Sequence, residues 1–267
     1  MGKKMKHAPV YYTIAQVRHN PVLRLGTYAP EIQDRMRKAG YPDYQPGKSL
    51  VINFLQQPTD GSTQPQGPVT ETIERHTFLS MDGTRGFIVE QGSFSFHTTE
   101  YETFDKFSEQ FFAGLEIVHQ CLSLDFSERV GIRYLDAVVP AGGESELKKY
   151  LSPGVLGLAG RLPDDVPIAL SMSETHIGMP DANLLSRTLI RNGPLGFPMD
   201  LAGQGLQVPQ RFQNVSGVHA IIDTDASQEG RQSFDLVRLR ERLDMLHTKI
   251  RMAFEASVTE YALKMWE

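Results

Sequence analysis

The sequence has very little cysteine, little excess charge of either sign and no long apolar run. Cys121 is its one cysteine, so an internal disulfide and a multi-cysteine zinc site are both excluded. No segment approaches the roughly 18 consecutive apolar residues that a transmembrane helix needs. The formal net charge is −5, so a broad basic face for nucleic acid is not indicated.

The first six residues, MGKKMK, carry positive charge, but the apolar stretch of a secretory signal peptide does not follow them. A phosphate-binding loop, a dinucleotide fingerprint and a Gly-x-Ser-x-Gly elbow are also missing. We therefore expect a cytoplasmic protein without a membrane anchor. No cofactor is predicted, and whether the chain is an enzyme is left open.

The strongest pattern that the sequence does contain is an apolar stripe at steps of three and four in its last third, typical of one amphipathic helix. A single helix from Asp235 to Met265 would be about 45 Å long. It would therefore cross the whole molecule. The members of the stripe are Leu236, Leu239, Leu243, Leu246, Ile250, Phe254, Val258, Tyr261 and Met265.

The remaining elements are predicted from alternation, caps and turn residues. A second long helix is expected to open at a capping box formed by Thr99 and Glu102 and to end near Ser123. The segment 56–72 is rich in Pro, Gly, Gln and Thr and is predicted to be a loop. Short helices are predicted at 31–39 and 144–151, and strands at 10–17, 49–55, 77–80, 86–91, 93–98, 129–139, 167–178, 183–192 and 217–224.

Clustered strands and two long helices indicate an α+β fold, with mainly antiparallel sheet covered by the helices. Each half of the chain shows several strands followed by a long helix, which suggests a remote internal duplication. The expected halves are 1–140 and 141–267, with one shared core.

The strand around Gly131 contains charged residues among apolar ones. Alternation places Tyr134 and Asp136 on one face and Arg133 on the other. A buried charge is costly unless it is paired. Arg133 is therefore either part of an ion-pair network that fixes strand register or a contact for an anion or a partner.

Three further clusters of polar residues have both a structural and a functional interpretation. Asp223 and Asp225 share one strand face and could hold a divalent cation, although aspartate is also common at strand ends. Glu174 and His176 could add ligands or an acid–base pair, or form a polar strand face.

On the terminal helix, His247, Arg251 and Glu255 are spaced by four residues along one flank. That flank is either a row of intrahelical pairs or a recognition surface. The candidate binding residues are therefore Arg133, Tyr134, Asp136, His247, Arg251 and Glu255, and the weak metal candidates are Asp223, Asp225 and His176.

Four short motifs carry a resemblance to a known family. They are Ala15-Gln16-Val17-Arg18 with Pro21, Phe96-His97-Thr98-Thr99 before Tyr101-x-x-Phe104, Gly131-x-Arg133-Tyr134-x-Asp136, and His247-x-x-Ile250-x-x-x-Phe254-Glu255-x-x-x-Thr259-Glu260. In their order and spacing they resemble a sporadically distributed, uncharacterised family of bacterial proteins of about 250 residues, close to the 267 of this chain. The resemblance covers nearly the whole chain and implies no catalytic residues. The patchy distribution of that family implies an association with mobile elements or phage-defence loci.

Three hypotheses of function follow. The first is a non-enzymatic binding or regulatory protein, such as an accessory factor of a defence or mobile-element locus, which has a protein partner and forms a homodimer. The second is a metal-assisted enzyme that uses Asp223 and Asp225. The third is a small-molecule sensor with a pocket between sheet and helices. That pocket would be lined by Phe104, Phe107, Phe111 and Tyr134.

Overall fold

One antiparallel sheet is the frame onto which the rest of the chain packs. The computed structural model describes residues 7–53, 69–140, 146–163, 165–201 and 205–267. Its strands are β1 (Val10–His19), β2 (Asp43–Asn53), β3 (Val69–Leu79), β4 (Arg85–Glu90), β5 (Ser93–Thr98), β6 (Phe126–Val138), β7 (Leu170–Gly178), β8 (Asn183–Asn192) and β9 (Val218–Ser233). The nine strands are ordered β2-β3-β4-β5-β1-β6-β9-β8-β7. Strands from both halves of the sequence therefore share one sheet, with β6 paired to β9.

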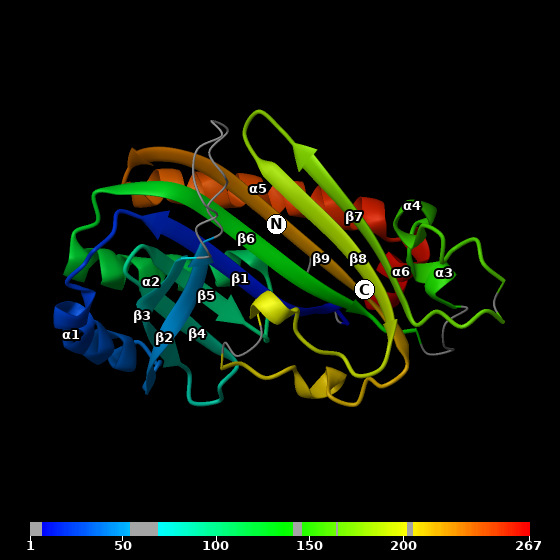
Figure 1. Ribbon diagram of the computed structural model, residues 1–267, viewed down its shortest axis with the longest axis horizontal. Helices are drawn as coiled ribbons and strands as arrows, with labels where there is room; N and C mark the ends of the chain where they lie inside the picture. The colour runs from blue at the N-terminus through cyan, green and yellow to red at the C-terminus, as the bar shows by residue number, and fades with distance from the viewer. Residues whose placement is uncertain (1–6, 54–68, 141–145, 164, 202–204) are drawn as a thin grey trace.

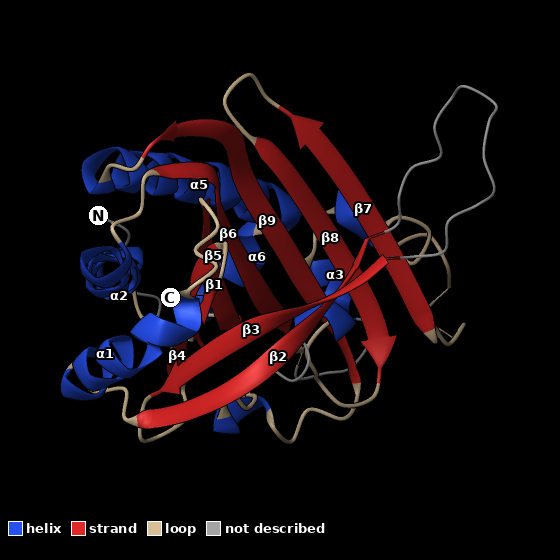
Figure 2. Ribbon diagram, turned by 60° about the vertical axis from the view of Figure 1, so that its left-hand side comes forward, coloured by secondary structure: helices blue, strands red, loops and turns tan. Residues whose placement is uncertain are grey.

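Helices cover one face of this sheet (Figures 1 and 2). They are α1 (Leu25–Lys38), α2 (Phe104–Leu122) and α5 (Leu236–Ser257), while α3 (Leu147–Tyr150), α4 (Pro153–Leu156) and α6 (Glu260–Trp266) pack at one end. The α+β class and the antiparallel sheet are confirmed. In place of two long helices the described part of the chain has six, and the predicted internal duplication stays a prediction. No described helix has the length and apolar character needed to cross a bilayer.

The opposite face of the sheet is covered in part by the segment 193–215, whose described residues cross in front of the sheet in Figure 1 (yellow). This segment brings Leu195 and Leu201 against Leu135 and Ile221. It contains two short 3-10 helices, η2 (Met199–Leu201) and η3 (Gln210–Phe212). Residues 130–138 of β6 and 219–224 of β9 are consequently buried between the two layers.

Aromatic side chains form the main core between the helices and the sheet. Phe94 and Phe96 alternate on β5, so both point to the helix face. There they contact Phe111 and Phe107 of α2, with ring centroids 5.5 and 5.2 Å apart. Phe107 and Phe111 are 3% and 0% exposed. They are therefore core residues, so two of the four side chains that the sensor hypothesis placed around a pocket are packed in the core instead.

The prediction of one uninterrupted terminal helix is wrong. Helix α5 begins at the Asp235 cap, which accepts hydrogen bonds from two backbone amides, and it ends at Ser257. Val258 is extended and bridges Leu151, and the Thr259 hydroxyl then caps α6. Thr259 also donates its backbone N–H to the Tyr150 carbonyl at 2.9 Å. Two β-branched residues with non-helical partners thus end the helix.

Beyond this break the predicted apolar stripe also fails. Tyr261 and Met265 are 43% and 49% exposed, whereas Ala262 and Trp266 are buried instead. The interruption rotates α6 relative to α5, so the spacing that holds along α5 does not continue into α6.

The predicted capping box of the second helix is misplaced by one turn. Thr99 lies at the end of β5, where its hydroxyl donates to the Thr84 carbonyl at 3.3 Å. The N-cap of α2 is Thr103, whose side chain accepts the Lys106 amide. The expected end of this helix at Ser123 is confirmed, and Ser123 adopts the left-handed conformation with φ of 50°.

Several other predicted boundaries shift, while the element types agree. Helix α1 starts earlier than predicted and contains Pro30. Strand β8 has the predicted bounds, and β9 continues to Ser233. The predicted loop at 56–72 falls mostly outside the described residues, and its last residues belong to β3. The predicted helix at 144–151 is reduced to α3 within the described residues.

Gly114 provides a test of the aromatic core. A Cβ at this position of α2 would overlap the Phe87 ring, and Phe87 is held by Tyr41 and Phe96 at centroid distances of 4.4 and 4.8 Å. We expect Gly114→Ala to lower the free energy of unfolding by about 1–3 kcal/mol, measured by urea denaturation. At an exposed helix position the same change stabilises by up to about 1 kcal/mol. Ala113→Gly, at the neighbouring exposed position, measures the difference in helix propensity between alanine and glycine in α2. A Gly114→Ala protein that is more stable than the original would contradict the assigned packing.

Candidate functional site

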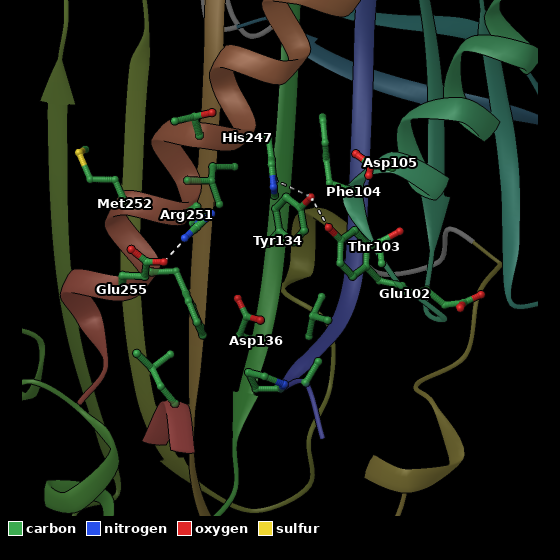
Figure 3. A pocket seen from close by; sticks show the side chains of 18 of the residues that line it. Glu102, Thr103, Phe104, Asp105, Tyr134, Asp136, His247, Arg251, Met252 and Glu255 are labelled. Carbon is green, nitrogen blue, oxygen red and sulfur yellow. Dashed lines mark hydrogen bonds and ion pairs between the residues drawn. The ribbon is translucent and has the colours of Figure 1, made fainter. Parts of the chain in front are cut away.

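A large cavity lies between the sheet and the helices, at the end of the sheet where α6 packs. Its volume is about 1010 Å³. Its walls come from the start of β1, residues 101–105, β6, α5 and α6. Five of the six predicted binding residues line it: Tyr134, Asp136, His247, Arg251 and Glu255 (Figure 3). We call this cavity the Asp136 pocket.

Asp136 is the most unusual side chain of the pocket. It is only 7% exposed, and Figure 3 shows its carboxylate in the space between Tyr134 and the helices. Within the described residues it has no hydrogen-bond or ion-pair partner. Burial, with a smaller contribution from the charge of Asp223, raises the pKa of Asp136 to about 7. A buried carboxyl without a partner favours its neutral form.

Next to Asp136, two tyrosines and a histidine form a hydrogen-bonded chain. The Tyr134 hydroxyl donates to the Tyr101 hydroxyl at 3.2 Å. It is also hydrogen-bonded to His247 Nδ1 at 3.2 Å. The His247 ring stacks on Phe104, with centroids 4.0 Å apart and planes at 1°. Burial, together with the nearby Arg251 charge, lowers the pKa of His247 to about 4, so this ring is neutral at pH 7.

The rim of the pocket is acidic. The lining residues include six carboxylates and one arginine. That arginine, Arg251, donates to Glu255 at 2.8 Å, as the intrahelical interpretation predicted. Glu102 forms a similar pair with Lys106 at 2.9 Å. The rim pairs are exposed and contribute about 0.3–0.5 kcal/mol each to stability.

Arg133 lies on the opposite face of the sheet, as alternation predicted. Its Nε and Nη2 atoms donate to the two carboxylate oxygens of Asp223, at 2.6 and 2.8 Å. Its Nη1 donates to Asp200 of η2. Burial alone would lower the pKa of Arg133, but hydrogen bonds to Asp223 and Asp200 together raise it. Arg133 is thus part of an ion-pair network and does not line the pocket.

The same network extends to the weak metal candidates. Arg187 of β8 lies 3.2 Å from Asp223 and 3.8 Å from Glu174. Glu174 in turn lies 2.7 Å from His176 Nε2. Asp225 is 3.8 Å from Arg129. The carboxylates thus alternate with arginines along β6, β9, β8 and β7.

No group of three or more His, Cys, Asp or Glu side chains suited to a metal ion occurs among the residues that the structure describes. Asp223 has two arginine neighbours in the place where a cation was predicted. The metal hypothesis stays a prediction that no contact in this network supports.

Several pocket residues were not predicted as binding residues. Tyr101, Asp105 and Asp244 line the pocket from segments that sequence periodicity does not bring together. Tyr101 lies in one of the four motifs that carry the family resemblance, Tyr101-x-x-Phe104, and this was the available signal. Phe104 was proposed for a pocket, and it does line this one.

Comparison with models of known protein families, with curated proteins and with solved structures finds no match to this chain. The functional argument therefore depends on the geometry of the site.

The Arg133 network predicts that alanine substitutions of two aspartates on the same face of β9 lower the free energy of unfolding by very different amounts. Asp223→Ala leaves Arg133 and Arg187 without their shared carboxylate. We expect it to lower the free energy of unfolding by about 3–5 kcal/mol. Asp225 is 31% exposed, and among the described residues its one ion pair is the 3.8 Å contact with Arg129, so Asp225→Ala should cost at most about 1 kcal/mol. Equal losses in urea denaturation would contradict this assignment.

The raised pKa of Asp136 predicts a pH-dependent stability. Between its unfolded pKa of about 4 and its folded pKa of about 7, the folded protein binds more protons than the unfolded chain. The free energy of unfolding therefore falls as pH rises through this window. Asp136→Asn removes the effect, so its stability relative to the original protein should rise by about 2–3 kcal/mol from pH 5 to pH 8. A difference that stays constant with pH would contradict the assigned environment.

Proposed function

We propose that this protein is a small-molecule-binding protein and that its ligand occupies the Asp136 pocket. The observation that carries the proposal is that one cavity is lined both by the Tyr134–His247 pair and by a buried carboxyl, that of Asp136, which has no partner among the described residues. Ligand pockets are commonly about 300–1,000 Å³ in volume, with mostly apolar walls and a few polar groups that fix orientation. The Asp136 pocket has both properties.

The lining of the pocket supports binding of an amphipathic molecule. Phe104, Ile250 and Phe254 supply apolar wall on the helix side. Asp136 of β6 and His247 of α5 supply polar atoms. Because His247 is neutral at pH 7, its ring can donate one hydrogen bond and accept another. A ligand with an apolar body and a polar head fits this division.

The small-molecule sensor hypothesis is therefore the one favoured by geometry. A protein partner, a homodimer, a cytoplasmic location and a role in a defence or mobile-element locus remain proposals from the sequence. Membership in a sporadically distributed bacterial family is likewise a proposal from the sequence. A downstream signalling role would require that ligand binding changes a surface that a partner reads.

Occlusion of the pocket tests the proposal without knowledge of the natural ligand. Thr248 is an exposed residue of α5 that lines the pocket. We expect the original protein to bind the neutral fluorescent probe N-phenyl-1-naphthylamine. Thr248→Trp should weaken that binding at least about tenfold, because the indole fills the pocket.

Ala256→Trp is the matched control, since Ala256 is also exposed on α5 and does not line the pocket. It should bind the probe as the original protein does, with an unchanged circular-dichroism spectrum. Absence of probe binding by the original protein, or equal loss in both tryptophan variants, would count against a ligand pocket at this place.

A further inference from the structure

We propose that the ligand of the Asp136 pocket is an organic ammonium ion, whose N–H groups donate to the Asp136 carboxylate and whose apolar body lies against Phe104 and α5. The inference rests on the proposed function and adds the chemical class of the ligand. Three independent features of the pocket carry it: an unused buried acceptor, the sign of the surrounding charge, and the aromatic wall.

The first feature is the unused acceptor capacity of Asp136. An ionised carboxylate has two oxygens and about four lone-pair sites. Asp136 is 93% buried, since its exposed fraction is 7%, and no hydrogen bond or ion pair to it occurs in the described part of the chain. By contrast, Asp223 of the neighbouring strand is bound by two arginines. A buried carboxyl destabilises the folded protein unless another group pairs with it. Asp136 lines the pocket, so a ligand bound there could be that group.

The second feature is the charge of the lining. Asp105, Asp244 and Glu267 line the pocket with Asp136 and have no ion-pair partner among the described residues. Arg251, the basic side chain of the lining, is already engaged by Glu255 at 2.8 Å. Concave sites lined by charge of one sign concentrate ions of the opposite sign. An anionic ligand would meet uncompensated carboxylates, whereas a cation would meet complementary charge.

The third feature is the aromatic wall. Tyr101 and Tyr134 pack edge to face with centroids 5.2 Å apart. Phe104, at the start of α2, stacks on His247, which is hydrogen-bonded to Tyr134. Aromatic rings attract cations in desolvated sites by roughly 2 kcal/mol. They also bury the apolar body of the ligand. The neutral His247 adds no competing positive charge at pH 7.

A free small amine fits better than a lysine side chain of a partner protein. The pocket volume of about 1010 Å³ exceeds what one extended lysine chain fills. The apolar contacts of Ile250, Phe254 and Leu263 would then stay unused. A lysine peptide is therefore the competing occupant to be tested.

A matched set of three ligands tests the charge requirement by isothermal titration calorimetry. The set is 1-naphthylmethylamine, which is an ammonium ion at pH 7.5, neutral 1-naphthalenemethanol and anionic 1-naphthoate. We expect the amine to bind at least about tenfold more tightly than the alcohol, because a charge-assisted hydrogen bond contributes roughly 1.5–3 kcal/mol. The naphthoate should bind more weakly than both.

Asp136→Asn should abolish the preference for the amine over the alcohol, because an amide cannot form the charge-assisted hydrogen bond. Asp43→Asn is the matched control, because Asp43 is exposed at the start of β2, outside the pocket. It should retain the full preference. In the original protein the amine affinity should rise from pH 6 to pH 8 as Asp136 ionises, while the alcohol affinity should stay constant.

The outcomes separate the two proposals. If N-phenyl-1-naphthylamine and the alcohol bind but the amine has no advantage, the pocket stands and the ammonium class is overturned. The same holds if naphthoate binds most tightly, or if Asp136→Asn keeps the preference. If Nα-acetyl-lysine methylamide, whose side-chain ammonium group is free, competes as well as the naphthyl amine, the occupant is a partner's lysine and the small-molecule assignment is overturned. If none of the probes binds, both proposals fail.

Discussion

Asp136 and Asp223 occupy neighbouring positions across the paired strands β6 and β9, on opposite faces of the sheet. Their charges repel through the sheet, and this repulsion adds to burial in raising the pKa of Asp136. Asp223 is stabilised by Arg133 and Arg187 on its own face. No cation of the described chain pairs with Asp136. The carboxylate on one face of this strand pair is therefore ion-paired, and the carboxyl on the other face is not.

The two faces of this strand pair therefore have different roles: the Asp223 face stabilises the sheet, and the Asp136 face lines the pocket. On the Asp223 face, the guanidinium groups fix the alignment of β6, β9 and β8, and η2 covers them through Asp200. Removing one partner there leaves a buried charge, which makes the network costly to break. On the Asp136 face, the strands leave a cavity beside α5 and α2. The register that the first face imposes therefore holds Asp136 and Tyr134 in place on the second.

Local patterns predicted much of this arrangement. Alternation along β6 correctly separated Arg133 from Tyr134 and Asp136, because side-chain direction in a strand has a fixed period of two. The spacing of four placed His247 and Arg251 on one flank of α5, and the pocket uses that flank. These predictions succeeded because each depends on the geometry of a single element.

The rest of the site depends on contacts between segments that are distant in sequence. Tyr101 reaches Tyr134 because β5 and β6 both pair with β1, which the sequence pattern of either strand does not reveal. Likewise, the partner of Arg133 in η2, Asp200, comes from a loop without periodicity. Apolar spacing also could not distinguish Phe107, which is buried in the core, from Phe104, which lines the pocket.

The break after α5, which the apolar stripe concealed, is what completes the pocket. A helix that continued straight from Ser257 would carry Leu263 away from β1. Instead, Thr259 redirects the chain, and α6 returns so that the Trp266 carbonyl accepts the backbone N–H of His7 at 3.0 Å. Leu263 then forms part of the pocket lining. The energy that favours this turn comes from burying Trp266 against Tyr150 and Phe254, with ring centroids 6.0 and 5.9 Å apart. Apolar packing remote from Asp136 thus shapes the space that the carboxyl faces.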